Sequence, residues 1–138
     1  MIMGSRDRFQ KFYANRSLFS SFAVAFAGIR HVFIYEINFK IELIICLLVF
    51  LSGFIFHYSY VEWALLILCM GLVLVGELIN TAIEALTDLT VGHRYHIHAK
   101  VAKDAAAGAV TLASLTAFLV GAIIVVPKLW FYIQSILK

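Results

Sequence analysis

The chain has 138 residues, of which 63% are hydrophobic and 14% charged, with a formal net charge of +3 and a mean hydropathy of +0.96. This balance lies far outside that of soluble globular domains and predicts a membrane protein. The basic residues are scattered, without the clustering among aromatic residues that is typical of nucleic-acid binding, so no nucleic-acid partner is expected. Because the chain has one proline and neither repeats nor low-complexity tracts, we expect one domain over residues 1–138.

An apolar stripe with the period of an α-helix occupies the N-terminal region. Its members recur at intervals near 3.6 residues; they are Leu18, Phe19, Phe22, Phe26, Ile29 and Phe33. Because polar and basic residues lie between them, the sequence predicts an amphipathic helix over about residues 15–35 that lies on the membrane surface. A fourth membrane-crossing helix is the alternative at this position.

Three further segments are long and apolar enough to span the hydrocarbon, which needs about 20 helical residues. They cover about residues 41–58, 63–86 and 105–126, and Pro127 is expected to stop the third helix, with the tail after it at the membrane interface. Because the chain is short and has three such runs, the alternative of buried core helices in a soluble protein is disfavoured.

The basic residues predict the orientation of these spans. Nine of them precede the first span or lie between the second and third, and two lie in the C-terminal flank. By the positive-inside rule, the N-terminus and the loop between the second and third spans face the cytoplasm.

The most informative stretch is GELINTAIEALTD, residues 76–88. At about 100° per residue, its polar members fall within an arc of about 100°; they are Glu77, Asn80, Thr81, Glu84 and Asp88. From the start of the span, Glu77 lies about 21 Å across and Glu84 about 31 Å. The polar stripe therefore climbs from inside the bilayer to its cytoplasmic edge.

Carboxylates at this depth need a physical reason. An ionised carboxylate at the centre of a membrane helix costs about 2.5 to 3.5 kcal/mol or more, so such residues usually mark a pathway or a reaction site. Polar contacts between helices through Asn80 and Thr81 are the structural alternative, but three acids on one face would repel each other. A hard cation such as Mg²⁺ removes this repulsion and takes its remaining ligands from water and phosphates, so ATP is the natural partner. The chain has no GxxxxGK[ST] or GxGxxG motif, so a nucleotide site must be built otherwise.

These residues carry a family resemblance. ELINTAIEALTD, followed by YH and AKVAKDAAAGAV, closely resembles the small prokaryotic membrane kinases that phosphorylate diacylglycerol or undecaprenol, and the likeness runs from Gly28 through YEINFKIE to Val126. It implies an all-α homotrimer of three-span subunits, each with a surface helix, in the bacterial cytoplasmic membrane. Active sites shared between subunits would face the cytoplasm and use Mg²⁺, ATP and a lipid alcohol.

The resemblance also implies roles for individual residues. Glu77 matches the general base, with Asn80 beside it, and Glu36 and Glu84 match the metal-binding pair. The implied nucleotide contacts are Asp88, His96, Lys103 and Asp104. Arg30 and Glu42 fall where the family handles the lipid and its headgroup.

The loop before the third span departs from the family. Arg94 stands before YH where an acid is common, and the spacing between Asp88 and His96 is about one residue longer. For His93, His96 and His98 three interpretations stay open: ordinary interfacial histidines, nucleotide contact by His96, and a metal site.

The sequence therefore predicts an ATP- and Mg²⁺-dependent lipid kinase, with undecaprenol ahead of diacylglycerol as acceptor. This order rests on overall likeness to the Gram-positive branch, for example GAII and the proline after the third span. One rival is a small proton-coupled transporter that carries its proton on Glu77, but an isolated acid would mark that function. Another is a non-catalytic assembly subunit, which would give the spacing of Glu77 and Glu84 no purpose.

Overall fold

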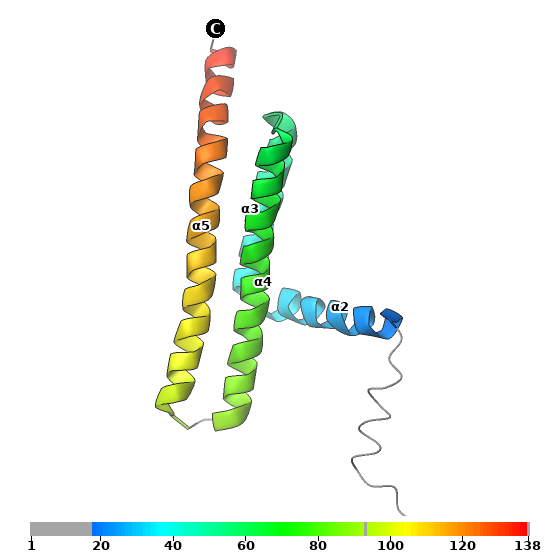
Figure 1. The fold of residues 1–138 in the computed structure, drawn as a ribbon, viewed down its shortest axis with the longest axis vertical. Helices are drawn as coiled ribbons and strands as arrows, with labels where there is room; N and C mark the ends of the chain where they lie inside the picture. Colours follow the sequence, from blue (N-terminus) through cyan, green and yellow to red (C-terminus); the bar gives the residue numbers. More distant parts are fainter. Residues whose placement is uncertain (1–17, 93, 138) are drawn as a thin grey trace, which may run out of the picture. The chain divides into compact units, whose positions relative to one another are not determined.

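The computed structural model of the protein describes residues 18–92 and 94–137. Within these residues all regular structure is helical and forms α2 (Leu18–Tyr35), α3 (Ile37–Ile55), α4 (Tyr60–Val91) and α5 (Ile97–Ile136) (Figure 1). This part of the chain confirms the expectation of an all-α protein. By length and composition, each of these helices is able to cross a membrane.

The chain divides after Tyr35 into two units, and α2 belongs to the first. The predicted N-terminal helix is present from Leu18 onward, and its residues 15–17 lie outside the described part of the chain. The aromatic side chains of its stripe are exposed, and Phe19 is 87% accessible. Large apolar side chains in this state suit contact with lipid. The position of α2 on the membrane surface stays a prediction.

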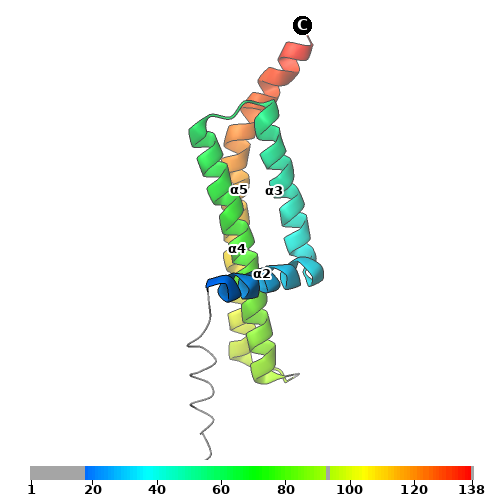
Figure 2. The same cartoon turned by 90° about the vertical axis from the view of Figure 1, so that its right-hand side faces the viewer.

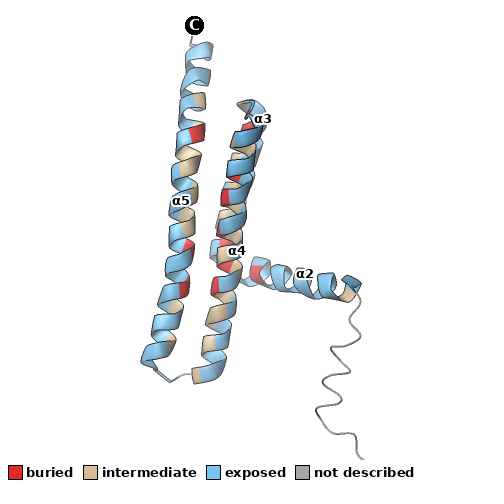
Figure 3. Ribbon diagram, viewed as in Figure 1, coloured by how far each residue is buried: buried red, intermediate tan, exposed pale blue. Residues whose placement is uncertain are grey.

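The second unit contains α3, α4 and α5. In both views α4 runs beside α5 and beside α3 (Figures 1 and 2), and its packing against α5 is the more extensive. The buried residues of α4 recur every three or four positions and so form one stripe (Figure 3); they are Leu66, Cys69, Val73, Glu77 and Asn80. This stripe is apolar at one end and polar at the other.

The helices are longer than the apolar runs, because local hydrogen bonds set their ends. At the start of α4, the Ser59 amide donates to Glu62 Oε2 at 2.6 Å and the Glu62 amide to Ser59 Oγ at 3.4 Å, which makes a capping box. α4 ends before Gly92, whose φ of 59° suits a residue without a side chain. At the start of α5, His96 Nδ1 accepts from the His98 amide at 3.3 Å.

The expectation that Pro127 stops the third helix is wrong, because α5 continues through it to Ile136. A proline lacks one backbone donor and costs roughly 3 kcal/mol inside a soluble helix. Membrane helices tolerate proline, because neighbouring helices, hydroxyl side chains and local helix adjustments provide partners for the freed backbone groups. Because Pro127 has no amide hydrogen, the backbone carbonyl of Ile123, four residues earlier, loses its hydrogen bond within the helix. Ile123 is 75% exposed. Figure 2 shows the end of α5 extending past the turn between α3 and α4.

Aromatic residues pack around the turn between α3 and α4. The ring centroid of Trp63 lies 5.1 Å from Phe50, 5.4 Å from Phe54 and 5.6 Å from Tyr58. Gly53 is buried beneath these rings. A Cβ built on Gly53 would come closer than 3.0 Å to atoms of Trp63 and Tyr58. The rings therefore pack directly on the backbone of α3.

Lys128 attaches α5 to this end of the unit. Its Nζ lies 3.1 Å from Glu62 Oε2 and 5.5 Å from the ring centroid of Tyr58. The first interaction joins α5 to α4, and the second joins α5 to the residues of the turn.

We predict that Gly53→Ala destabilises the protein by about 1 to 3 kcal/mol, because the added methyl group overpacks the rings of Trp63 and Tyr58. Gly71 is the matched control, since a Cβ there meets no atom within 4 Å and alanine is the better helix former. Thermal unfolding of both variants in detergent micelles measures the difference. Equal midpoints for Gly53→Ala and the parent would show that the turn yields to the methyl group.

Candidate active site

The buried stripe of α4 ends in two polar residues. Glu77 is 3% exposed and Asn80 is 9% exposed. Residues three apart lie on the same side of a helix, so both side chains face the other helices of the unit. Burial of a carboxylate without partners is costly. The groups around Glu77 therefore decide what this site can do.

Four carboxylates gather at this level of the unit. Glu36 and Glu84 both lie within electrostatic reach of Glu77, and Asn38 makes a side-chain hydrogen bond with it. Glu42 lies within electrostatic reach of Glu77 as well. The structure thus brings together, in one chain, the predicted base, the predicted metal-binding pair and one of the two predicted lipid-binding residues.

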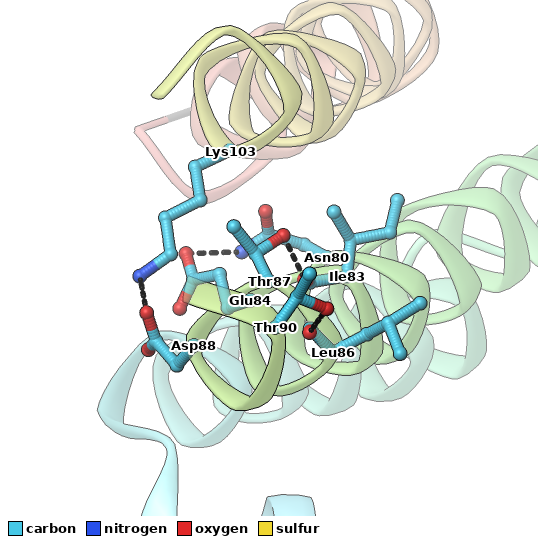
Figure 4. A network of polar contacts seen from close by, with 8 residues as sticks. All are labelled: Asn80, Ile83, Glu84, Leu86, Thr87, Asp88, Thr90 and Lys103. Carbon is cyan, nitrogen blue, oxygen red and sulfur yellow. Dashed lines mark hydrogen bonds and ion pairs between the residues drawn. The ribbon is translucent and has the colours of Figure 1, made fainter. Parts of the chain in front are cut away.

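Asn80 connects this group to the next turn of α4. Its Nδ2 donates to Glu84 Oε1 at 3.3 Å (Figure 4). The opposite orientation of the amide would place two acceptors together, so the carboxylate of Glu84 fixes it. Asn80 Oδ1 is buried and has no hydrogen-bond partner among the described residues. An unpaired buried acceptor costs about 1 to 3 kcal/mol, so this oxygen suits a donor on a bound molecule.

The carboxylates fit a hard cation that keeps several waters. Among the described residues, no group of three or more His, Cys, Asp or Glu side chains forms a metal site. A pair such as Glu36 and Glu84 offers only oxygen ligands, and Mg²⁺ is commonly held by one or two carboxylates together with water and phosphate oxygens. The donor chemistry fits the predicted metal, and its binding by this pair stays a prediction.

An ion pair between α4 and α5 lies one turn beyond Glu84. Lys103 Nζ is 2.7 Å from Asp88 Oδ1, and Figure 4 shows the lysine reaching across from α5. Lys100 pairs with Asp104 on α5 itself. Lys103 and Asp104, which the family resemblance places side by side at the nucleotide, therefore have different partners here. Both pairs are largely exposed, so they position side chains more than they stabilise the fold.

The four predicted nucleotide-binding residues line one open pocket of about 390 Å³ between the end of α4 and the start of α5. Its charged residues are Asp88, Arg94, Lys100, Lys103 and Asp104, and His96 also lines it. Three basic side chains against two acidic ones suit a phosphate chain. His93 lies outside the described residues.

A second pocket, of about 540 Å³, has Glu77 in its wall. We call it the polar pocket; its polar residues are Asn38, Glu42, Glu77, Asn80, Thr111 and Ser114. Three of them are absent from the sequence-based site: Asn38, Thr111 and Ser114. Asn38 stands four residues before Glu42 and hence on the same face of α3. This spacing could have placed Asn38 in the predicted site. Thr111 and Ser114 join only because α5 packs at this height beside α4.

Arg30, the other predicted lipid-binding residue, is exposed on α2 and belongs to the first unit. Its role at the lipid headgroup stays a prediction.

Lys103, which precedes the apolar part of α5, gives the ion pair a measurable titration. Its hydrogen bond with Asp88 raises the pKa of the lysine above the ordinary 10.5, and the charges of Asp88 and Glu84 act in the same direction. A raised lysine pKa means that the pair is formed below 10.5 and is lost as the pH rises through the raised value. We predict that Asp88→Asn returns the Lys103 titration toward 10.5, whereas Asp104→Asn does not.

NMR titration of ¹³C-lysine-labelled protein in micelles measures this midpoint. Asp104→Asn is the matched control, because Asp104 pairs with Lys100. If Asp88→Asn left the midpoint of Lys103 unchanged, the ion pair would not exist in solution.

Comparisons with known proteins show the family of the chain. Residues 23–125 match the model of the family described as prokaryotic diacylglycerol kinase, and this range includes every predicted site residue. A diacylglycerol kinase of Synechocystis sp. is 42% identical over 113 residues, which cover 82% of this chain and 65% of that protein. An undecaprenol kinase of Bacillus subtilis is 39% identical over 111 residues, which cover 80% of this chain and 89% of that protein.

A diacylglycerol kinase of Helicobacter pylori is 35% identical over 94 residues, which cover 68% of this chain and 73% of that protein. The three names denote lipid kinases and differ in the lipid. Because the family model matches residues 23–125, well over half of its length, the chain belongs to the prokaryotic diacylglycerol kinase family.

Proposed function

We propose that this chain is an ATP- and Mg²⁺-dependent kinase of a membrane lipid alcohol, with undecaprenol as the preferred acceptor and diacylglycerol as the alternative. The observation that carries the proposal is the position of Glu77. It lies buried in the wall of the polar pocket, within electrostatic reach of two oxygen-donor side chains, Glu36 and Glu84. A proton-coupled transporter would need only the first of these features, and family membership favours the kinase.

In this proposal Glu77 is the general base. As the acceptor oxygen bonds to the γ-phosphorus, its proton passes to the Glu77 carboxylate, and the bond from the γ-phosphorus to the bridging oxygen of ADP breaks. The amides of Asn38 and Asn80 line the polar pocket together with this carboxylate. The hydrogen bond from Asn80 to Glu84 limits the rotation of the Glu84 carboxylate. Limiting rotation in this way helps to position the side chains that take part in the transfer.

The donor nucleotide would lie on the other side of Glu84. The pocket lined by Asp88, His96 and Lys103 opens at the end of the α4–α5 hairpin, and Lys103 is close enough to Glu84 to feel its charge. Glu36 and Glu84 would hold Mg²⁺, which would supply charge neutralisation for the transferring phosphoryl group. Lys103 supplies a further fixed positive charge at the same level.

Two buried unpaired atoms of the polar pocket suit the hydroxyl group that both candidate lipids carry, and neither atom suits an ester carbonyl. Among the described residues these atoms are Glu42 Oε2 and Asn80 Oδ1, and both are acceptors. A lipid hydroxyl donates a hydrogen bond, so either oxygen is able to receive it. The ester carbonyls of a diacylglycerol need donors, which these two atoms do not provide. The names of the relatives divide between the two lipids.

The assembly and the orientation belong to the same proposal. We place the chain in the bacterial cytoplasmic membrane as a homotrimer of three-span subunits with shared active sites. The N-terminus, α2 and the nucleotide pocket would face the cytoplasm. The positive-inside distribution of basic residues and the family resemblance support this arrangement.

The acceptor is tested by direct competition of lipids under matched conditions. Purified full-length chain, radiolabelled ATP and Mg²⁺ are combined with undecaprenol or dioleoylglycerol at equal mole fraction in the same micelles. We expect kcat/KM to be at least about tenfold higher for undecaprenol, a difference of roughly 1.4 kcal/mol in transition-state binding. Equal or reversed efficiencies would make the protein a diacylglycerol kinase, and no product from either lipid would refute the kinase itself.

The base is tested by Glu77→Gln, which keeps the shape of the side chain and removes its ability to accept a proton. We expect turnover below a few per cent of the parent rate while nucleotide binding persists. Glu62→Gln makes the same change on the same helix at its far end, where Glu62 pairs with Lys128, and should keep most of the activity. Substantial turnover by Glu77→Gln would remove Glu77 from the role of base.

A further inference from the structure

An apolar groove adjoins the polar pocket in the same unit. The groove has a volume of about 440 Å³ and shares three wall residues with the polar pocket: Glu42, Ser114 and Phe118. Along α5 it continues from Ser114 to Val126, which is about 18 Å at 1.5 Å per residue. A molecule with one polar end and a long apolar chain matches this combination of a polar pocket and an adjoining groove.

Apolar residues from all three helices form the groove. Its remaining walls are Ile45, Cys46 and Val49 on α3, Leu66, Cys69, Met70 and Val73 on α4, and Ala117, Gly121, Ala122, Val125 and Val126 on α5. A Cβ built on Gly121 meets no atom within 4 Å. The small residues of α5 therefore leave this space open.

Ser114 lies where the two spaces meet. It is half-buried in the wall of both, and within the described part of the chain its hydroxyl makes no hydrogen bond. Thr111, one turn earlier, already donates to the Ala107 carbonyl at 2.9 Å. The two buried unpaired oxygens near this junction are acceptors. Ser114 thus offers a hydroxyl donor without a partner among the described residues, at a junction whose buried unpaired atoms are both acceptors.

We propose, on the basis of the function above, that Ser114 determines which acceptor lipid this enzyme uses. With the lipid hydroxyl at Glu77, the chain of the lipid passes Ser114 into the groove. In a polyprenol the atoms at that level are hydrocarbon, which accepts no hydrogen bond from the serine hydroxyl. In a diacylglycerol they include an ester carbonyl, which accepts a hydrogen bond from it. Ser114 therefore supports the activity with diacylglycerol and is indifferent to undecaprenol.

The variant Ser114→Ala is expected to affect kcat/KM differently for the two lipids. We expect kcat/KM for dioleoylglycerol to fall about tenfold, since a site that hydrogen-bonds a substrate loses discrimination when its partner is removed. The value for undecaprenol should stay within about twofold. Thr116→Val is the matched control: Thr116 is exposed on α5 and its hydroxyl is bonded to the Leu112 carbonyl, so both efficiencies should be unchanged.

Three results would overturn the role of Ser114: an equal fall for both lipids, no fall for dioleoylglycerol, or a fall for undecaprenol alone. Each of these is read against a parent protein that phosphorylates at least one of the lipids. A parent that phosphorylates neither refutes the proposed function itself, so the two failures are distinguishable.

Gly121→Leu tests the path of the lipid chain. The leucine side chain would fill open space in the groove, so we expect KM for undecaprenol to rise at least about fivefold while KM for ATP stays within about twofold. Elution volume and thermal midpoint confirm that the variant is folded. If Gly121→Leu folds and leaves both constants unchanged, the chain does not lie in the groove; if it fails to fold, Ser114→Ala still decides the proposal.

Discussion

A carboxylate held inside a membrane helix is the constraint on which the rest of the structure depends. Glu77 is almost fully buried, and in lipid no water is present to solvate it. Partners must therefore come from the neighbouring helices at the same height. α3 contributes Asn38 and Glu42, and α5 contributes Thr111 and Ser114, to the wall of the pocket that Glu77 also lines. α3 and α5 are apolar along most of their length, and several of their polar residues lie in this one pocket.

In the second unit, ion pairs join α5 to α4 near both ends, and a groove lies between these ends. Lys128 joins α5 to Glu62 near one end of α4, and Lys103 joins it to Asp88 near the other. The pair of Lys103 with Asp88 is the more exposed of the two, and pairs of this kind add little stability; both join residues that lie at the same height on α4 and α5. The small residues of α5 between the two pairs do not fill the space beside α3, which leaves the groove. The shift along the helix axis thus decides which α5 residues meet Glu77.

The sequence predicted what depends on a single helix. The 3.6-residue period placed Glu77, Asn80 and Glu84 on one face of α4, and hydropathy located the apolar centre of each helix. It did not predict the helix through Pro127, since the penalty for proline was taken from soluble proteins. Ser114 was missed for a different reason. Its role depends on the register between α4 and α5, which no periodicity within either helix specifies.

The arrangement also bears on how a kinase in a membrane avoids transferring phosphate to water. In the proposed function, the nucleotide comes from the exposed pocket at the end of the hairpin, and the acceptor comes from the groove on the opposite side of Glu77. A general base that activates a lipid hydroxyl would activate a water molecule equally well. Because Glu77 is only 3% exposed, water reaches it mainly through the polar pocket, the space that the lipid's hydroxyl end would occupy. Occupancy of that pocket would therefore provide the acceptor and exclude its chief competitor in one step.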